Sequence, residues 1–289
     1  MPWQFNIDSD GHSPERAFII SESKRAWGYE SPFPDIQDPK EPRLFRQIFA
    51  NLRIRYEDSR TLSNDFVEMY GKQWSPSSKD SEQKYCKNPS INVSFPEYDA
   101  FVLDSMIRTY KPRRILELGS GQSTRIMTSV VSELQLETKI TCIDRYADDK
   151  VKNSLRSMKV DFEEIDITEL DPTFLCELQQ NDIFFIDSSH VLKNFGDVEF
   201  IFNYLFPLIP RGVIVHVHDI FLPYNYPSAW IIDWKSVLTE QQILGSWLDN
   251  RQEVQILAAN FWNLKNGVAV PESLEHKVGG SFWFRVNSS

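Results

Sequence analysis

The sequence predicts an α/β protein with a Rossmann-like, mostly parallel sheet of seven strands, helices on both faces and an antiparallel last strand. From residue 115 onward, short apolar segments alternate with segments of helical periodicity. A Gly-Ser-Gly turn follows the first apolar segment, and acidic residues end or follow the next ones. Alternation of strands and helices is typical of a parallel sheet that is covered on both sides.

Seven segments have the length and composition of strands. They are residues 115–118, 139–144, 160–165, 182–187, 213–219, 253–262 and 281–286. The fourth is apolar with an acid at either end, as expected of a central strand buried on both faces. Helices are expected at residues 96–110, 123–134, 151–158, 170–179, 198–208 and 239–248.

Residues 1–94 are predicted to form an N-terminal extension to a domain of residues 95–289. Several prolines exclude a long helix over residues 1–40, where aromatic side chains favour an arm packed on the body. Apolar residues at helical spacing over 43–56 indicate an amphipathic helix, docked on its own domain or on a second subunit, so a homo-oligomer stays open. Residues 57–93 are polar and turn-rich, and form either a mobile lid or a surface connection.

The composition is that of a soluble globular protein, with 41% hydrophobic and 25% charged residues among 289. The net charge of −10 disfavours a nucleic-acid partner, which requires a basic surface. Cys86, Cys142 and Cys176 are widely spaced, so we expect reduced thiols. The N-terminus lacks the signal-peptide pattern, and no apolar run approaches the roughly 18 residues of a membrane span. These features together predict a cytoplasmic protein without a membrane span.

Acidic residues at the ends of the strand segments predict a ligand site. Ligands of open parallel sheets bind at the carboxyl ends of the strands. Gly119 and Gly121 follow the first strand and allow the backbone to approach a ligand closely. The helix after them would direct unpaired N–H groups at that ligand. The acids at or just past the later strand ends are Asp144, Asp166, Asp187 and Asp219.

Three sequence segments carry a resemblance to a known family. Residues 117–121 (Glu-Leu-Gly-Ser-Gly), with Asp144 and Asp187 after the second and fourth strands, resemble a class I S-adenosylmethionine (SAM)-dependent methyltransferase. Residues 185–190 (Phe-Ile-Asp-Ser-Ser-His) and 216–220 (His-Val-His-Asp-Ile) resemble its bacterial branch of natural-product sugar O-methyltransferases and cephalosporin-hydroxylase-like proteins. The resemblance covers most of the predicted domain and does not explain the N-terminal extension.

The resemblance implies SAM as the cofactor. It implies that the glycine turn binds the methionine and ribose end, that Asp144 accepts hydrogen bonds from the ribose hydroxyls, and that Asp166 and Ile167 flank the adenine. The implied cofactor residues are Glu117, Gly119, Ser120, Gly121, Ser123, Asp144, Asp166, Ile167 and Asp187. Structural alternatives stay open: the glycines serve only a tight turn, Asp144 caps a helix, and Asp166 is an ordinary loop acid.

The resemblance places the chemistry at Asp187, His190, His218 and Asp219. Methyl transfer to oxygen requires the acceptor hydroxyl to be positioned and to lose its proton. A histidine can accept that proton. Alternatively, Mg2+ held by Asp187 and Asp219 acidifies the hydroxyl, as in related metal-dependent O-methyltransferases. Ile220 departs from that pattern, because some of those enzymes place a third oxygen ligand there.

Two neighbouring features have plainer interpretations. His216 faces the same side of its strand as His218 but lies deeper, so a buried core role is expected. The aromatic residues between 221 and 230 are expected to form a rim for the acceptor, although simple packing would also explain them.

The leading hypothesis is SAM-dependent O-methylation of a small-molecule or carbohydrate hydroxyl. One alternative is a methyltransferase-fold protein with a binding or scaffolding role, or with a different, hydroxylase-like reaction. An NAD-dependent oxidoreductase also places an acid about 20 residues past its glycines. Against that class, Thr124 replaces the third glycine of the dinucleotide motif and Glu117 precedes the turn.

Overall fold

The computed structural model describes residues 40, 42–49, 52, 55–74, 95–249, 251–274 and 278–287. The predicted N-terminal arm, apart from Lys40, lies outside the described residues, as do Cys86 and about half of the predicted lid, residues 75–93. Cys142 and Cys176 are free thiols. Within the described ranges, no helix has both the length and the apolar character needed to cross a bilayer.

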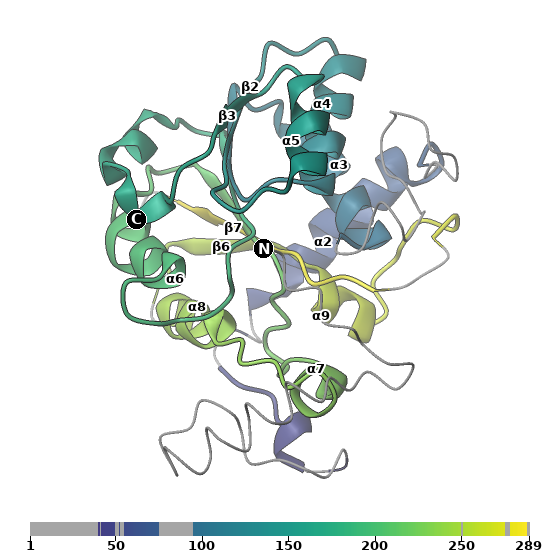
Figure 1. The fold of residues 1–289 in the computed structure, drawn as a ribbon. Helices are drawn as coiled ribbons and strands as arrows, with labels where there is room; N and C mark the ends of the chain where they lie inside the picture. The colour runs from purple at the N-terminus through teal and green to yellow at the C-terminus, as the bar shows by residue number, and fades with distance from the viewer. Residues whose placement is uncertain are drawn as a thin grey trace.

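Seven strands form one sheet in the order β3-β2-β1-β4-β5-β7-β6 (Figure 1). Strands β1 to β5 pair in parallel, whereas β7 pairs antiparallel with both β5 and β6. The strands are β1 Arg114–Leu118, β2 Lys139–Ile143, β3 Asp161–Glu163, β4 Ile183–Ile186, β5 Ile214–Val217, β6 Val254–Ala259 and β7 Phe282–Val286. The predicted mostly parallel sheet with an antiparallel last strand is confirmed.

Helices cover both faces of this sheet. Figure 1 shows α3, α4 and α5 together on one side, and α6 and α8 on the other. The α-helices are α2 Glu57–Phe66, α3 Glu97–Tyr110, α4 Gln122–Glu133, α5 Asp149–Arg156, α6 Asp197–Phe200, α7 Ser228–Ile232, α8 Glu240–Asp249 and α9 Asn260–Lys265. Short 3-10 or π segments are η2 Pro42–Phe45, η4 Val67–Gly71, η5 Ile167–Glu169, η6 Pro172–Glu177, η7 Ile201–Leu205 and η8 Phe206–Leu208.

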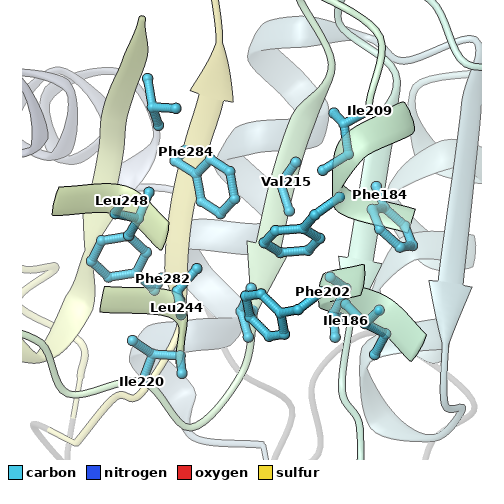
Figure 2. Packing of buried hydrophobic residues seen from close by; sticks show 14 of the residues in the cluster. Phe184, Ile186, Phe202, Ile209, Val215, Ile220, Leu244, Leu248, Phe282 and Phe284 are labelled. Carbon is cyan, nitrogen blue, oxygen red and sulfur yellow. The ribbon is translucent and has the colours of Figure 1, made fainter. Parts of the chain in front are cut away.

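The side chains of each strand alternate between two hydrophobic cores, one on each face of the sheet. In β4, Phe184 and Ile186 belong to one core and Phe185 to the other. Figure 2 shows the first core, where Phe202 of η7 and Leu244 of α8 pack with side chains of β4, β5 and β7. Helices α3 and α4 pack their apolar side chains into the second core. Burial on both faces explains why β4 is apolar throughout.

Several predicted elements differ from the structure. The described part of segment 43–56 contains η2 and irregular chain instead of an amphipathic α-helix, whereas α2 lies in segment 57–93, which was predicted to be turn-rich. The predicted strand 253–262 ends at Ala259 and continues as α9. The predicted helix 170–179 is the 3-10 helix η6, which begins at a proline.

Polar contacts bury α2 against β6 and α9. Ser59 Oγ donates a hydrogen bond to Asn263 Oδ1 at 3.0 Å and accepts one from Ala259 N at 2.9 Å. Ser63 Oγ accepts a hydrogen bond from Asn263 Nδ2 at 2.7 Å. Because two of the three buried residues of α2 are serines and only Phe66 is apolar, hydrophobic periodicity does not reveal this helix.

Candidate active site

The carboxyl ends of four parallel strands meet along one edge of the sheet. At this edge, the first residue after each of these strands still makes a backbone hydrogen bond to a neighbouring strand. The hydrogen bonds run from Gly119 N to Ile143 O (2.9 Å), Asp144 N to Glu163 O (3.1 Å), Asp187 N to Leu118 O (3.0 Å) and His218 N to Ile186 O (2.9 Å). The sheet therefore brings these donor residues side by side although they are far apart in the sequence.

Gly119 lies where the chain turns out of β1, with φ of 95°. A Cβ atom there would come within 2.7 Å of the Asp187 carbonyl oxygen. Glycine is thus required both by the backbone conformation and by the close approach. A Cβ atom at Gly121 would meet open space, and the Gly121 N–H donates to Thr124 Oγ1 at 3.0 Å in the first turn of α4. The turn leaves room for a ligand next to the start of this helix.

Glu117 lies beneath the glycine turn and is fully buried. Its carboxylate accepts hydrogen bonds from Ser123 Oγ, from Thr124 Oγ1 at 2.6 Å and from Cys142 Sγ at 3.1 Å. Burial raises the pKa of Glu117 to about 7, although these hydrogen bonds act to lower it. The hydrogen bond from Ser123 to Glu117 thus stabilises the glycine turn on the side of the core.

A cavity of about 480 Å3 opens at this edge of the sheet, within the range of small-molecule sites. The predicted site residues that line it are Gly119, Ser120, Asp144, Asp166, Ile167, Asp187, His190, His218 and Asp219. Glu117, Gly121 and Ser123, predicted to contact the cofactor, are not among the lining residues. Tyr146 and Phe195 also line the cavity, are 81% and 95% exposed, and were not predicted from the sequence.

Asp144 presents its carboxylate in this cavity. Its Oδ2 accepts a hydrogen bond from Ser120 Oγ at 2.6 Å, and its Oδ1 accepts one from Tyr146 N at 2.8 Å. The N-cap of the following helix α5 is Asp148, whose side chain accepts from Val151 N. Asp144 is therefore not the cap of α5, which was the alternative to a ligand role.

Asp166 has a structural role in addition to its place in the cavity. It caps η5 by accepting a hydrogen bond from Thr168 N at 3.0 Å, and it accepts another from Arg145 Nη1 at 3.0 Å. Burial acts to raise the pKa of Asp166, but the bonds from Thr168 and Arg145 outweigh it and lower the pKa. Ile167 follows directly and adds an apolar surface to the same wall.

The four residues predicted to carry the chemistry form one cluster. Asp187 Oδ1 lies 3.3 Å from His190 Nε2 and 3.5 Å from His218 Nδ1. Asp219 places one oxygen 3.6 Å from His190 Nε2 and the other 3.6 Å from His218 Nδ1. His190 and Asp219 have positive φ values of 61° and 55°. Such conformations are uncommon outside glycine and concentrate at functional sites.

Two buried carboxylates that the sequence did not reveal complete this cluster. Glu240, the first residue of α8, places Oε2 2.7 Å from His190 Nδ1. Asp99, in the first turn of α3, places Oδ2 3.4 Å from His218 Nε2. Both acids are fully buried. In the sequence, each of the two is recognisable only as an acid within a predicted helix, next to residues that are expected to face the core.

The charges in this cluster shift the pKa values of its members. Burial acts to lower the pKa of His190, but Asp187 and Glu240 raise it to about 10. Burial opposes protonation of His218 too, yet Asp219 and Asp187 raise its pKa. The pKa of Asp187 is lowered, because the two histidines outweigh the effect of burial. Burial raises the pKa of Asp219 more than the histidines lower it.

His216 is a buried core residue, as predicted. It is fully buried, its Nε2 lies 2.9 Å from Ser281 Oγ, and its ring stacks on Phe185 with centroids 3.7 Å apart. Burial lowers the pKa of His216 well below its usual value. The His216 imidazole is therefore a neutral ring packed in the second core.

Asp187, His190 and His218 have the side chains and spacing to hold a cation. One ligand atom from each lies within 4.8 Å of the other two. The sequence predicted Asp187 and Asp219 for this role. Within the described residues, Asp219 falls outside this group but lies beside both histidines.

One family model and several solved structures are similar to this chain. Residues 116–220 match the family model of a methyltransferase domain. No curated protein sequence gives a significant match. One similar solved structure is CmcI with magnesium and SAM, at 16% identity and a TM-score of 0.38, covering 66% of this chain and 72% of that chain.

Two further solved structures are methyltransferases. The SAH-bound methyltransferase PaMTH1 of Podospora anserina is 13% identical, with a TM-score of 0.42, and the match covers 89% of this chain and all of that chain. The plantazolicin methyltransferase BpumL, with SAH and a pentazolic desmethylPZN analog, is 16% identical, with a TM-score of 0.41 and coverage of 65% and 82%. Because all three TM-scores are below 0.5, no property of these proteins is carried over to this chain.

The matched segment begins in β1 and ends one residue after Asp219, so it contains the glycine turn, Asp144 and all four residues of the predicted catalytic cluster. The sheet has the seven mostly parallel strands and the antiparallel last strand that were predicted from the sequence. Residues 116–220, which contain this site, are therefore similar to a methyltransferase domain.

Proposed function

We propose that this protein is a class I SAM-dependent methyltransferase that transfers the methyl group of SAM to a hydroxyl of a small-molecule or carbohydrate acceptor. The observation that carries the proposal is the cluster of Asp187, His190, His218 and Asp219 in the same cavity as the glycine turn and Asp144. A hydroxyl must lose its proton during transfer, and such a cluster of acids and imidazoles supplies groups for that step. The net charge of −10 supports a small acceptor over a nucleic acid.

The residues around the cavity fit SAM. Gly119 lines the cavity without a side chain, and Asp144 offers carboxylate oxygens to a ribose. Asp166 and Ile167 lie at the wall proposed for the adenine. We propose that Glu117, Gly121 and Ser123 support this arrangement through the shape of the turn.

Deprotonation of the acceptor has two candidate routes, a histidine base or a divalent cation. We favour a cation, because Asp187, His190 and His218 with neighbouring Asp219 offer a fitting donor set. When bound, it would lower the pKa of the acceptor hydroxyl.

The acceptor would enter past exposed aromatic side chains. Tyr146 and Phe195 line the cavity, and aromatic faces suit sugars and ring-bearing molecules. The rim expected from residues 221–230 is less supported. Phe221 packs edge to face on Trp230 with ring centroids 5.2 Å apart, and the residues between 221 and 230 do not line the cavity.

Calorimetry with SAM and SAH tests the cofactor site. The wild-type protein should bind both, and Asp144→Asn should bind about tenfold or more weakly, because a hydrogen bond to a charged group is lost. Asp149→Asn, an exposed acid on α5, is the matched control. Equal SAH affinity in Asp144→Asn would contradict the assigned ribose contact.

Mass spectrometry of a panel of sugar, phenol and amine acceptors tests the reaction. We expect gain of one methyl group on hydroxyl-bearing acceptors, with loss of turnover after chelation and its return when a divalent ion is added. Methylation of amines alone would refute the O-methyltransferase proposal. Turnover that is unaffected by chelation would reject the cation.

A further inference from the structure

We propose that Asp187, His190 and His218 bind a first-row transition ion such as Fe2+, Co2+ or Zn2+ in preference to Mg2+. This inference deepens the proposed function and depends on the cation proposed for the same site. It differs from the magnesium pair predicted from the sequence, Asp187 and Asp219, in that two of the three ligands are imidazole nitrogens.

The distances between the ligand atoms suit a shared ion. Atoms that each lie about 2.1 Å from one ion are about 3.0 Å apart at octahedral angles and about 3.4 Å apart at tetrahedral angles. Asp187 Oδ1 is 3.3 Å from His190 Nε2 and 3.5 Å from His218 Nδ1. Asp219, at 3.6 Å from each of these nitrogens, lies within reach as a further ligand after a small adjustment.

Each histidine has its other ring nitrogen directed at a buried acid. Glu240 Oε2 is hydrogen-bonded to His190 Nδ1 at 2.7 Å. Asp99 Oδ2 lies 3.4 Å from His218 Nε2, which is buried and makes no hydrogen bond in this structure, so this second contact is a close approach of the acid to the ring. Metal-binding histidines typically donate their second N–H to a carboxylate, which fixes the tautomer and the ring orientation. Here this arrangement leaves His190 Nε2 and His218 Nδ1 to face Asp187.

Both supporting acids are themselves held in place. Glu240 Oε1 accepts a hydrogen bond from Ser188 Oγ at 3.0 Å. Asp99 accepts hydrogen bonds from Gly280 N at 2.9 Å and from Ser281 N at 3.1 Å. Because these contacts come from several parts of the fold, the positions of the two rings are set before any ion binds.

The start of α8 also fixes the backbone of His190. The N–H groups of Thr239 and Glu240 donate to the His190 carbonyl oxygen at 2.9 and 3.1 Å. In addition, Leu192 N donates to Thr239 Oγ1 at 2.7 Å. These bonds hold His190 in its left-handed conformation, which costs free energy in a non-glycine residue. The imidazole is thereby kept in the cavity.

This donor set favours one class of ion. Mg2+ prefers oxygen ligands, keeps several waters and is usually bound through carboxylates. Imidazole nitrogen suits Fe, Ni, Cu and Zn, and two histidines with one carboxylate are a known ligand set for Fe2+. A site formed by Asp187 and Asp219 alone would lack the imidazole nitrogens that favour these ions over Mg2+.

Metal titrations of chelator-treated protein test the inference without any acceptor. We expect Co2+ and Zn2+ to bind at least about tenfold more tightly than Mg2+ by calorimetry, and Co2+ to show visible absorption bands typical of nitrogen ligands. His190→Gln should lower Co2+ affinity about tenfold or more. Glu240→Gln, which preserves shape but not charge, should lower it by about 10- to 100-fold. Gln242→Ala, at an exposed position on α8, is the matched control and should bind Co2+ as the wild type does.

Several results would overturn the inference. Mg2+ binding as tight as Co2+ binding would indicate an oxygen site and leave the proposed function intact. No ion binding at millimolar concentration, with SAH binding preserved, would remove the cation altogether. Unchanged Co2+ affinity in both His190→Gln and Glu240→Gln would place the ion elsewhere. The proposed function fails separately, by loss of SAH binding in the wild type.

Discussion

Replacing Glu117 with glutamine should change how the stability of the protein depends on pH. In the folded protein burial raises the pKa of Glu117 to about 7, whereas its ordinary value is 4.5. Between these pH values the folded state binds more protons than the unfolded state. Raising the pH therefore favours unfolding, and the stability that Glu117 contributes is present below about pH 4.5 and lost as the pH rises to about 7.

The magnitude follows from the same two values. The interval from 4.5 to about 7 corresponds to about 3 kcal/mol, at about 1.36 kcal/mol per pH unit. Glu117→Gln keeps an acceptor for Ser123 and cannot ionise. Relative to the wild type, we expect its free energy of unfolding to increase by about 3 kcal/mol between pH 4.5 and pH 8.

Urea unfolding of both proteins at several pH values measures this difference. Glu137→Gln, an exposed glutamate near the end of α4, controls for the exchange of a carboxyl for an amide on the surface. If the difference in unfolding free energy between Glu117→Gln and the wild type is constant from pH 4.5 to pH 8, burial does not raise the pKa of Glu117 as described above.

Two further substitutions probe the turn and the core. Gly119→Ala should lower the free energy of unfolding by about 1–3 kcal/mol and abolish SAH binding. The cause is the added Cβ atom, which would meet the Asp187 carbonyl oxygen at 2.7 Å. Thermal unfolding measures the first effect and calorimetry with SAH the second. Gly267→Ala also has a positive φ but meets no atom within 4 Å, so SAH binding should survive there. Phe184→Ala in β4 should cost about 3–5 kcal/mol in urea unfolding, whereas Tyr204→Ala, 53% exposed, should cost about 0.5 kcal/mol or less.

The central part of the fold could be predicted from the sequence because its signals are local. The apolar strands β1, β2, β4 and β5 appear as short runs bounded by charges or glycine, and their predicted positions agree with the structure to within a few residues. The lining acids Asp144, Asp187 and Asp219 were predictable for the same reason, since parallel strands end at one edge of the sheet.

The missed elements depend on contacts that are distant in the sequence. Helix α2 buries Ser59 and Ser63 against Asn263, about 200 residues away, and its own composition is polar. Glu240 supports His190 from 50 positions further along, and an acid at the start of a helix is equally typical of a capping role. Only the folded structure shows that these polar residues face inward.

Strand β7 has a consequence for how the chain can be shortened. It lies between β5 and β6 and pairs with both, and it is formed by Phe282–Val286. A chain truncated before Phe282 would lose one strand and detach β6, which reaches the sheet through β7. The apolar strand β5, Ile214–Val217, would then become an open edge, a template for pairing with other chains. C-terminal truncation should thus cause aggregation before it affects cofactor binding.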